Sequence, residues 1–343
     1  MPDTPRRVAV FALGGTIAMT PAQAGGVTPA LAAQDLIASV PGLAETGIAL
    51  DVVDFRRVPG ASLRFDDLIQ LCEAISTTLA GRVDGIVITQ GTDTIEETAY
   101  LLDLYHTADH PVVVTGAMRN PAMAGADGPA NLLAAILTAA HPAARGHGVL
   151  VVLSDEIHAA QRVRKTHSTN VGTFQSPNAG PLGYVVENVP YFHNRLAHRL
   201  HVPLPSAGLP RVGMITIALG DQGELLDGID TKLDALIIAA MGVGHVPDYL
   251  VAPLEKLATT MPVVLASRTG AGPVLRKTYG FPGSERDLNS RGLLPAGFLH
   301  PLKARLLLAA ALAAGADRQQ IADTIAVAGG YAEADSWPWP QGA

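Results

Sequence analysis

The 343-residue sequence contains a single cysteine, so no disulfide can form within the chain. That residue, Cys72, falls on an apolar helical stripe with Leu71 and Ile75. No histidine or basic residue lies near it in sequence, so the pattern favours a buried structural thiol over a reactive nucleophile.

Charged side chains are also scarce: they make up 16% of the residues, and the net charge is −7. A nucleic-acid-binding domain normally carries a basic surface, which this composition does not provide. We therefore expect a modestly acidic protein whose partners are small molecules or other proteins, and no nucleic acid.

Long apolar runs are missing as well. The N-terminal Met1–Arg7 segment is followed by only six apolar residues before Gly14, which is too short for the apolar region of a signal peptide. Apolar runs elsewhere are too short or too interrupted to span a bilayer. We expect no membrane contact and a cytoplasmic location.

Apolar residues nevertheless form 48% of the chain, enough for a sizeable core. Short runs rich in Val, Ile and Leu are bounded by Gly, Asp or Pro, as in strands buried on both faces of a parallel sheet. These runs predict strands at Val8–Leu13, Gly85–Gln90, Val112–Thr115, Val149–Ser154, Val212–Leu219, Leu236–Ala239 and Val263–Ser267.

Helical patterns separate these strands. The spacing of apolar residues predicts helices over Asp66–Leu79, Thr94–Tyr105, Pro129–Ala140, Pro247–Thr259 and His300–Ala314. A capping box of Thr94 and Glu97 would open the second of these helices, and Asp127 would cap the third. The alternation of strands and helices predicts an α/β fold with open parallel sheets.

The alternation breaks between Pro177 and Pro210, where prolines, histidines and arginines occur without a sustained period. This segment is typical of a linker or irregular edge structure. We therefore predict a larger N-terminal domain over residues 1–195, a linker over 196–210, and a smaller C-terminal α/β domain over 211–343.

Polar residues follow two of the predicted strands at their carboxyl ends, where ligands bind in open α/β sheets. The first strand leads into Gly14-Gly15-Thr16, and the second leads into Gly91-Thr92-Asp93. A dinucleotide fingerprint would need a third glycine and a phosphate loop would need Gly-Lys-Ser/Thr, and neither is present. A Gly-Gly-Thr turn by itself is usually only a turn.

Thr92 and Asp93 place a hydroxyl and a carboxylate at the start of a helix, where backbone N–H groups can hold an anion. Lys165 follows the fourth strand, and a lysine close to a threonine hydroxyl can act as its base when desolvation lowers its pKa. By composition alone, Lys165 would be a surface residue.

A set of short segments spread over nearly the whole chain carries a family resemblance. They are Gly14-Gly15-Thr16-Ile17-Ala18, Gly91-Thr92-Asp93-Thr94, Glu96-Glu97-Thr98-Ala99-Tyr100, Gly116-Ala117-Met118-Arg119, Asp127-Gly128-Pro129, Asn131-Leu132, Val163-Arg164-Lys165-Thr166, Pro181-Leu182-Gly183-Tyr184, Tyr279-Gly280-Phe281 and Lys303-Ala304-Arg305. Their order and spacing resemble the bacterial L-asparaginase (asparaginase/glutaminase) family.

The resemblance implies two α/β domains in each subunit and self-association into intimate dimers and homotetramers. It implies hydrolysis of L-asparagine to L-aspartate and ammonia without a metal or an organic cofactor. Thr16 would then be the nucleophile on a mobile loop, supported by Thr92, Lys165 and Asp93.

Substrate contacts also follow from the resemblance. The Thr92 backbone N–H would help form the oxyanion hole, and the Ala117 carbonyl would contact the substrate amide. Asp93 would bind the amino group of the substrate, together with Glu285 from the neighbouring subunit. Ser62 is the candidate ligand of the α-carboxylate.

The chain departs from the family pattern near Thr16. Leu13 stands where the family usually has threonine, and Gln90 where it often has histidine. The loop after Thr16 normally carries a tyrosine, but its best match here is Val27, and no tyrosine occurs between Thr16 and Tyr100. The missing tyrosine leaves three alternatives: the proton of the nucleophile is handled differently, another tyrosine takes its place, or the loop works mainly as a lid.

Three other functions fit the same residues. One is an amidohydrolase that prefers glutamine or another side-chain amide, and a second is a glutamyl-tRNA amidotransferase subunit. The amidotransferase is disfavoured because the chain shows neither an added N-terminal domain nor a basic surface. The third is a protein that binds amino acids without catalysis, since shifted side-chain pKa values mark binding sites as well as catalytic ones.

Overall fold

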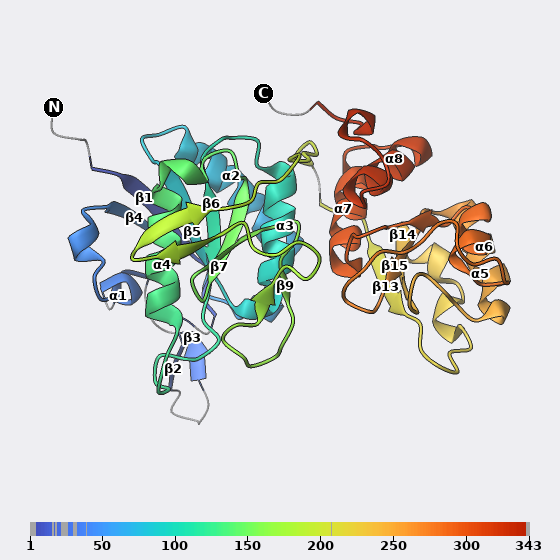
Figure 1. Ribbon diagram of the computed structural model, residues 1–343, viewed down its shortest axis with the longest axis horizontal. Coiled ribbons are helices and arrows are strands. Elements are labelled where there is room, and N and C mark those ends of the chain that lie inside the picture. Colours follow the sequence, from blue (N-terminus) through green and yellow to red (C-terminus); the bar gives the residue numbers. More distant parts are fainter. Residues whose placement is uncertain are drawn as a thin grey trace. The chain divides into compact units, whose positions relative to one another are not determined.

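The computed structural model describes residues 5–15, 17, 19–21, 27–29, 33–38, 40–206 and 208–340. They form two compact units that divide between Arg199 and Leu200, each built around its own sheet (Figure 1). The first unit holds a large sheet rich in parallel strands, and the second a smaller parallel sheet. The predicted α/β fold class is confirmed.

The large sheet begins with five parallel strands: β4 (Ala49–Asp54), β1 (Arg7–Ala12), β5 (Gly85–Thr89), β6 (Val112–Thr115) and β7 (Val149–Leu153). Three antiparallel strands complete it: β8 (Glu156–Ala159), β11 (Gly183–Val186) and β12 (Val189–Phe192). The apolar runs predicted β1, β5, β6 and β7 to within one residue at each end. β4 was not predicted, because its residues are partly buried or exposed and Asp51 and Asp54 interrupt the apolar run.

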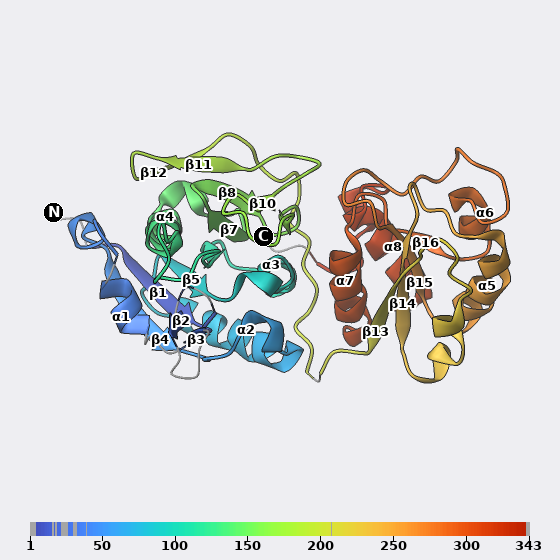
Figure 2. The ribbon, with the colours of Figure 1, turned by 90° about the horizontal axis from the view of Figure 1, so that it is seen from below.

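The stretch between Pro177 and Pro210 is not wholly irregular, so that part of the prediction was wrong. It contains the β11–β12 hairpin, which extends the sheet beyond β8 (Figure 2). Glu187 and Asn188 form its two-residue turn with φ values of 51° and 62°. Left-handed turn residues of this kind match the twist of a hairpin.

Helices cover both faces of the large sheet because successive strand residues point to opposite sides. α4 (Gly128–Ala140) packs on the face that carries Val8 and Val10. α2 (Phe65–Leu79) and α3 (Ile95–Tyr105) pack on the face that carries Ala9 and Phe11.

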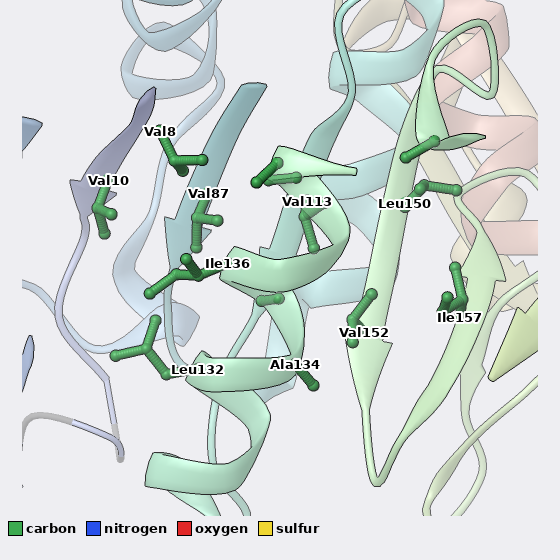
Figure 3. Packing of buried hydrophobic residues seen from close by; sticks show 14 of the residues in the cluster. Val8, Val10, Val87, Val113, Leu132, Ala134, Ile136, Leu150, Val152 and Ile157 are labelled. Atoms are coloured by element: carbon green, nitrogen blue, oxygen red, sulfur yellow. The ribbon is translucent and has the colours of Figure 1, made fainter. Parts of the chain in front are cut away.

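Figure 3 shows the α4 face from close by, with Leu132 and Ile136 against the valines of β1, β5 and β6. Both α4 side chains are fully buried, as are Val87 and Val113 opposite them. Apolar burial on the two faces therefore holds the strands whose ends carry the candidate site.

Smaller elements complete the N-terminal unit. They are α1 (Ala33–Ala38) and the antiparallel pairs β2 (Met19–Pro21) with β3 (Val27–Pro29) and β9 (Arg164–Lys165) with β10 (Phe174–Gln175). The β2–β3 pair lies within the loop that follows Thr16 in sequence.

The C-terminal unit has a four-stranded parallel sheet in the order β13 (Val212–Thr216), β14 (Ala235–Ala240), β15 (Val263–Ser267) and β16 (Leu294–Pro295). Its helices are α5 (Val251–Thr260), α6 (Glu285–Ser290), α7 (Pro301–Ala313) and α8 (Arg318–Ala328). α7 packs on β13 and β14, in agreement with the predicted Ala/Leu-rich helix. No helix in the described part of the chain is long and apolar enough to cross a membrane.

Replacing Ile136 by alanine tests the α4 contact. Ile136 is fully buried, so Ile136→Ala should lower the free energy of unfolding by about 2–5 kcal/mol, through lost burial and the cavity left behind. Urea unfolding followed by circular dichroism measures this loss. Val186→Ala, at a half-exposed position on β11, should change stability by less than about 0.5 kcal/mol. Equal losses in the two variants would contradict the assigned packing.

Candidate functional site

The strand order of the large sheet creates a crevice between the carboxyl ends of β1 and β5. The chain leaves β1 toward β4 on one side and leaves β5 toward β6 on the other side. Loops that diverge in this way open a space beyond the strand ends, which is where ligands bind in such sheets. Gly14-Gly15 follows β1 and Gly91-Thr92 follows β5, so both predicted segments lie at this switch point.

Three loops meet at the crevice by direct backbone contact. A Cβ placed on Gly15 would lie 2.1 Å from the backbone nitrogen of Gly91, and one on Gly60 would lie 2.7 Å from the carbonyl oxygen of Gly91. Gly14 and Gly15 have φ values of +99° and +90°. Only glycine accommodates both the contact and the left-handed backbone.

Thr16, the predicted nucleophile, lies outside the described residues. Its sequence neighbours Gly15 and Ile17 are described. Gly15 contacts Gly91, and Ile17 is buried against Gly128: a Cβ added to Gly128 would lie 2.9 Å from Ile17 Cγ1. The side chain of Val27, the match to the missing tyrosine, is also outside the described part.

Thr92, Asp93 and Lys165 come together although 72 residues separate Asp93 from Lys165. The Lys165 ammonium donates to Thr92 Oγ1 at 3.0 Å and to Asp93 Oδ1 at 2.8 Å. Thr92 is buried, the Lys165 side chain is 14% exposed, and Asp93 is 67% exposed. Lys165 is therefore not the surface residue that composition alone suggests, and it connects a buried hydroxyl with an accessible carboxylate.

Contacts of the Lys165 backbone position this side chain. Lys165 pairs with Phe174 between β9 and β10, and its N–H donates to Glu96 Oε1 at 3.2 Å. Glu96 is buried in the first turn of α3, two residues after Thr94. α3 thus carries the acceptor that fixes Lys165, and the turn before α3 carries Thr92 and Asp93.

Polar side chains at the start of α4, the half-buried Asp127 and the buried Asn131, hold the loop that contains Ala117. Asp127 accepts hydrogen bonds from the N–H groups of Met118 and Arg119 at 3.0 and 2.9 Å. Asn131 donates to the Gly116 carbonyl oxygen at 3.0 Å. The prediction that the Asp127 side chain caps α4 was wrong, because its carboxylate is used by this loop and makes no cap hydrogen bond.

A second polar chain links the β5 end to the loop of Ser62. Gln90, buried at the end of β5, donates from Nε2 to Thr94 Oγ1 at 3.3 Å, and Thr94 donates to the Gly60 carbonyl at 3.0 Å. The predicted capping box of Thr94 and Glu97 does not form, since Thr94 makes no cap bond. Ser62 ends the turn that starts at Gly60 and is exposed, so it is accessible to a ligand.

Glu285 belongs to the C-terminal unit, at the start of α6. Its side chain is fully buried; Oε1 accepts from the N–H groups of Thr278 and Tyr279 at 2.9 Å each, and Oε2 lies 3.3 Å from His245 Nε2. These contacts stabilise the loop before α6. Its predicted contact with the amino group of a substrate bound by the neighbouring subunit stays a prediction.

The ionisation of Glu285 follows from the same contacts. Burial opposes the charge, but hydrogen bonds from Tyr279, Thr278, its own backbone N–H and His245 outweigh it. Together they hold the pKa of the carboxyl below its ordinary value of 4.5. Glu285 is therefore a carboxylate at neutral pH.

Sequence reasoning proposed Thr92, Asp93, Lys165, Ala117 and Ser62 as site residues, but it gave no role to the groups that hold them. Glu96, Asn131 and the Gln90–Thr94 chain act through contacts between residues far apart in sequence. Among the described residues, no group of three or more His, Cys, Asp or Glu could hold a metal ion.

Comparisons with known proteins cover nearly the whole chain. Residues 7–197 match the family model "Asparaginase, N-terminal", and residues 211–325 match "Glutaminase/Asparaginase C-terminal domain". The protein named "Probable L-asparaginase" of Deinococcus radiodurans is 38% identical over 94% of this chain and 97% of its own length. A "Glutaminase-asparaginase" of Pseudomonas fluorescens is 33% identical over 92% of this chain and 88% of its own.

Solved structures agree. The crystal structure described as "Probable Cytoplasmic L-asparaginase from Campylobacter jejuni" matches with a TM-score of 0.84 and 31% identity, covering 93% of this chain and 99% of the other. Matching domains, close relatives and a shared fold lead to one conclusion: the chain belongs to the asparaginase family and is an amidohydrolase of the asparaginase type.

Proposed function

We propose that the protein hydrolyses L-asparagine to L-aspartate and ammonia, with Thr16 as the nucleophile and with Thr92, Lys165 and Asp93 as the supporting set. The observation that carries the proposal is the contact of the Lys165 ammonium with both the Thr92 hydroxyl and the Asp93 carboxylate. A largely buried lysine beside a buried hydroxyl is the arrangement expected of a proton-transfer pair.

The first step is attack of the Thr16 hydroxyl on the side-chain amide carbon. Lys165 acts in this step as the neutral amine: the Thr16 proton passes to the Thr92 hydroxyl as Thr92 gives its own proton to the amine, and the amide oxygen becomes an oxyanion. The Thr92 backbone N–H lies at the start of the turn that leads into α3, where N–H groups favour negative charge. Collapse breaks the C–N bond, and the leaving nitrogen takes the proton and departs as ammonia.

The second step is hydrolysis of the resulting ester by water. Water adds to the ester carbon, loses a proton to the same pair, and the C–O bond to Thr16 breaks. L-Aspartate leaves and the Thr16 hydroxyl recovers its proton. The same hydroxyl–amine pair thus serves as base and acid in both steps.

Substrate contacts are assigned to groups around the crevice. The exposed Asp93 carboxylate is suited to an ammonium group, the Ala117 carbonyl to the amide N–H, and the Ser62 hydroxyl to the α-carboxylate. The Gln90–Thr94–Gly60 chain supports the loop of Ser62.

Glutamine is the second candidate substrate, and a named relative favours it. The Pseudomonas fluorescens protein that matches 92% of this chain is called a glutaminase-asparaginase. The same residues would act on either amide, since the substrates differ by one methylene, which a pocket discriminates by only about 10–200-fold. Self-association and a cytoplasmic location stay predictions.

Ammonia release from L-asparagine and L-glutamine tests the nucleophile. Thr16→Ala should lower kcat by at least about a thousandfold, because the covalent route is lost. Thr77→Ala, which removes an exposed hydroxyl on α2, is the matched control and should keep full activity. Activity retained in Thr16→Ala would move the nucleophile to Thr92. A wild-type protein that frees no ammonia from any amide would leave a non-catalytic binding protein instead.

The proton-transfer pair has its own test. Thr92→Val and Lys165→Met should each lower kcat by about 10²–10⁴-fold, the usual contribution of general acid–base catalysis. Because the two groups act as a unit, the double variant should lose much less than the product of the single losses. Steady-state kinetics measure all three, with exposed Lys256→Met as the control. Fully multiplicative losses would show that the two groups act independently.

The structural role of Glu285 predicts a dependence of stability on pH. Because its pKa is lowered on folding, its ionised form stabilises the protein above about pH 4.5, and this contribution disappears as pH falls through the folded-state pKa. Glu285→Gln should lower the free energy of unfolding by about 1–3 kcal/mol at pH 7 and converge with wild type in acid.

Denaturant unfolding of wild type and Glu285→Gln across about pH 3–7 measures this dependence, because the range spans the ordinary pKa of a glutamate carboxyl. Exposed Glu224→Gln is the control in the same unit and should leave stability unchanged. A Glu285→Gln variant as stable as wild type at neutral pH, but with a raised KM, would instead assign Glu285 to substrate binding.

A further inference from the structure

A cavity of about 280 Å³ lies in the N-terminal unit, at the amino ends of β6 and β7. The C-terminal half of α2, the end of α3 and the loop 106–111 form its walls. Thr92 and Lys165 lie beyond the carboxyl ends of the parallel strands, so the cavity is at the opposite edge of the sheet. It is separate from the proposed catalytic site and does not depend on that proposal.

The lining is uncharged. Apolar side chains from α2, α3 and the strand starts form most of it, including Ile75, Leu102 and Val149, and no Asp, Glu, Lys or Arg contributes. Burial raises the pKa of the Cys72 thiol to about 12, and burial followed by the charge of Arg145 lowers the pKa of His110. Both groups are therefore neutral at pH 7, and no carboxylate, lysine or arginine lines the cavity to balance a ligand charge.

Tyr105 contributes one of the polar groups of the lining, beside Ser76, Thr107 and two histidines. Its hydroxyl is buried and, within the described part of the chain, has no hydrogen-bond partner. A buried hydroxyl without a partner is unusual and unfavourable, so a molecule that bonds to it gains affinity. Desolvation raises the pKa of Tyr105, which keeps the phenol protonated and able to donate.

The walls of the cavity are held in place without a ligand. His106 Nε2 lies 2.7 Å from the His110 carbonyl oxygen, which closes the loop on itself. Arg199 donates to the carbonyl oxygens of Ala108, at 3.3 Å, and His106. Binding to a preformed cavity costs little conformational entropy, because the walls are already ordered, and such cavities are typical of small-molecule sites.

We propose that this cavity binds a small neutral aromatic molecule of one or two rings, with one hydrogen-bonding group that pairs with the Tyr105 hydroxyl. The volume fits this class, since an apolar cavity of roughly 150 Å³ already holds benzene. The zwitterionic amide amino acids are excluded by the uncharged lining.

Calorimetric titration with phenol and with indole tests the proposal. Benzene serves as the control ligand without a hydrogen-bonding group, and benzoate as the charged control. Phenol and indole should bind once per chain with high-micromolar to millimolar dissociation constants, and benzoate should not bind. Tyr105→Phe should weaken phenol binding about five- to tenfold and leave benzene binding unchanged, because only the hydrogen bond is lost. The matched control Tyr191→Phe, half-exposed on β12, should change neither.

Cys72 reports whether the ligand occupies this cavity. It lines the cavity and is the only cysteine in the chain, so alkylation by iodoacetamide reads a single site; because the raised pKa leaves little thiolate, the reaction is slow and is followed at alkaline pH with excess reagent. Saturating phenol should slow that alkylation severalfold. The proposal is overturned if neither phenol nor indole binds, if binding is unchanged in Tyr105→Phe, or if bound phenol leaves Cys72 unprotected.

Discussion

The carboxyl ends of β1 and β5 are joined by backbone packed directly on backbone, with Gly15, Gly60 and Gly91 in contact and no side chains between them. Any added Cβ at Gly15 would overlap Gly91, so the spacing of the loops around the crevice depends on glycine at these points. This contact brings Gly15, which precedes Thr16 in sequence, next to Gly91, which precedes Thr92. The proposed chemistry needs that proximity, because a nucleophile and its supporting groups must lie within hydrogen-bond reach.

Side chains outside the catalytic set hold the other loops in position. Glu96 fixes the backbone of Lys165, Asn131 and Asp127 fix the loop of Ala117, and Thr94 fixes Gly60. Glu96 and Asn131 are buried and Asp127 and Thr94 are half-buried, and at buried positions an unmade hydrogen bond is costly and the geometry is correspondingly well defined. The supporting shell thus belongs to α3, to α4 and to the residues just before them, which the apolar core holds against the sheet.

The two edges of the large sheet offer opposite chemistry. At the carboxyl ends, glycine turns and helix starts bring a lysine, a carboxylate and a hydroxyl together, which suits a charged amide amino acid. At the amino ends of β6 and β7, the cavity is lined mostly by apolar side chains, with the polar groups of Ser76, Tyr105, Thr107 and two histidines among them. One sheet can therefore support two sites that select against each other's ligands by charge.

The sequence by itself determined β1, β5, β6 and β7, because strands buried on both faces need continuous apolar runs bounded by turn residues. It also determined the family and the candidates Thr92, Asp93 and Lys165, because short motifs at strand ends survive as sequence patterns. Only the tertiary structure decided that Lys165 reaches Thr92, that Thr94 bonds Gly60 rather than capping α3, and that Glu285 is buried. It also decided that residues 183–192 extend the sheet. Each of these depends on pairings between distant residues, which local propensity and periodicity do not encode.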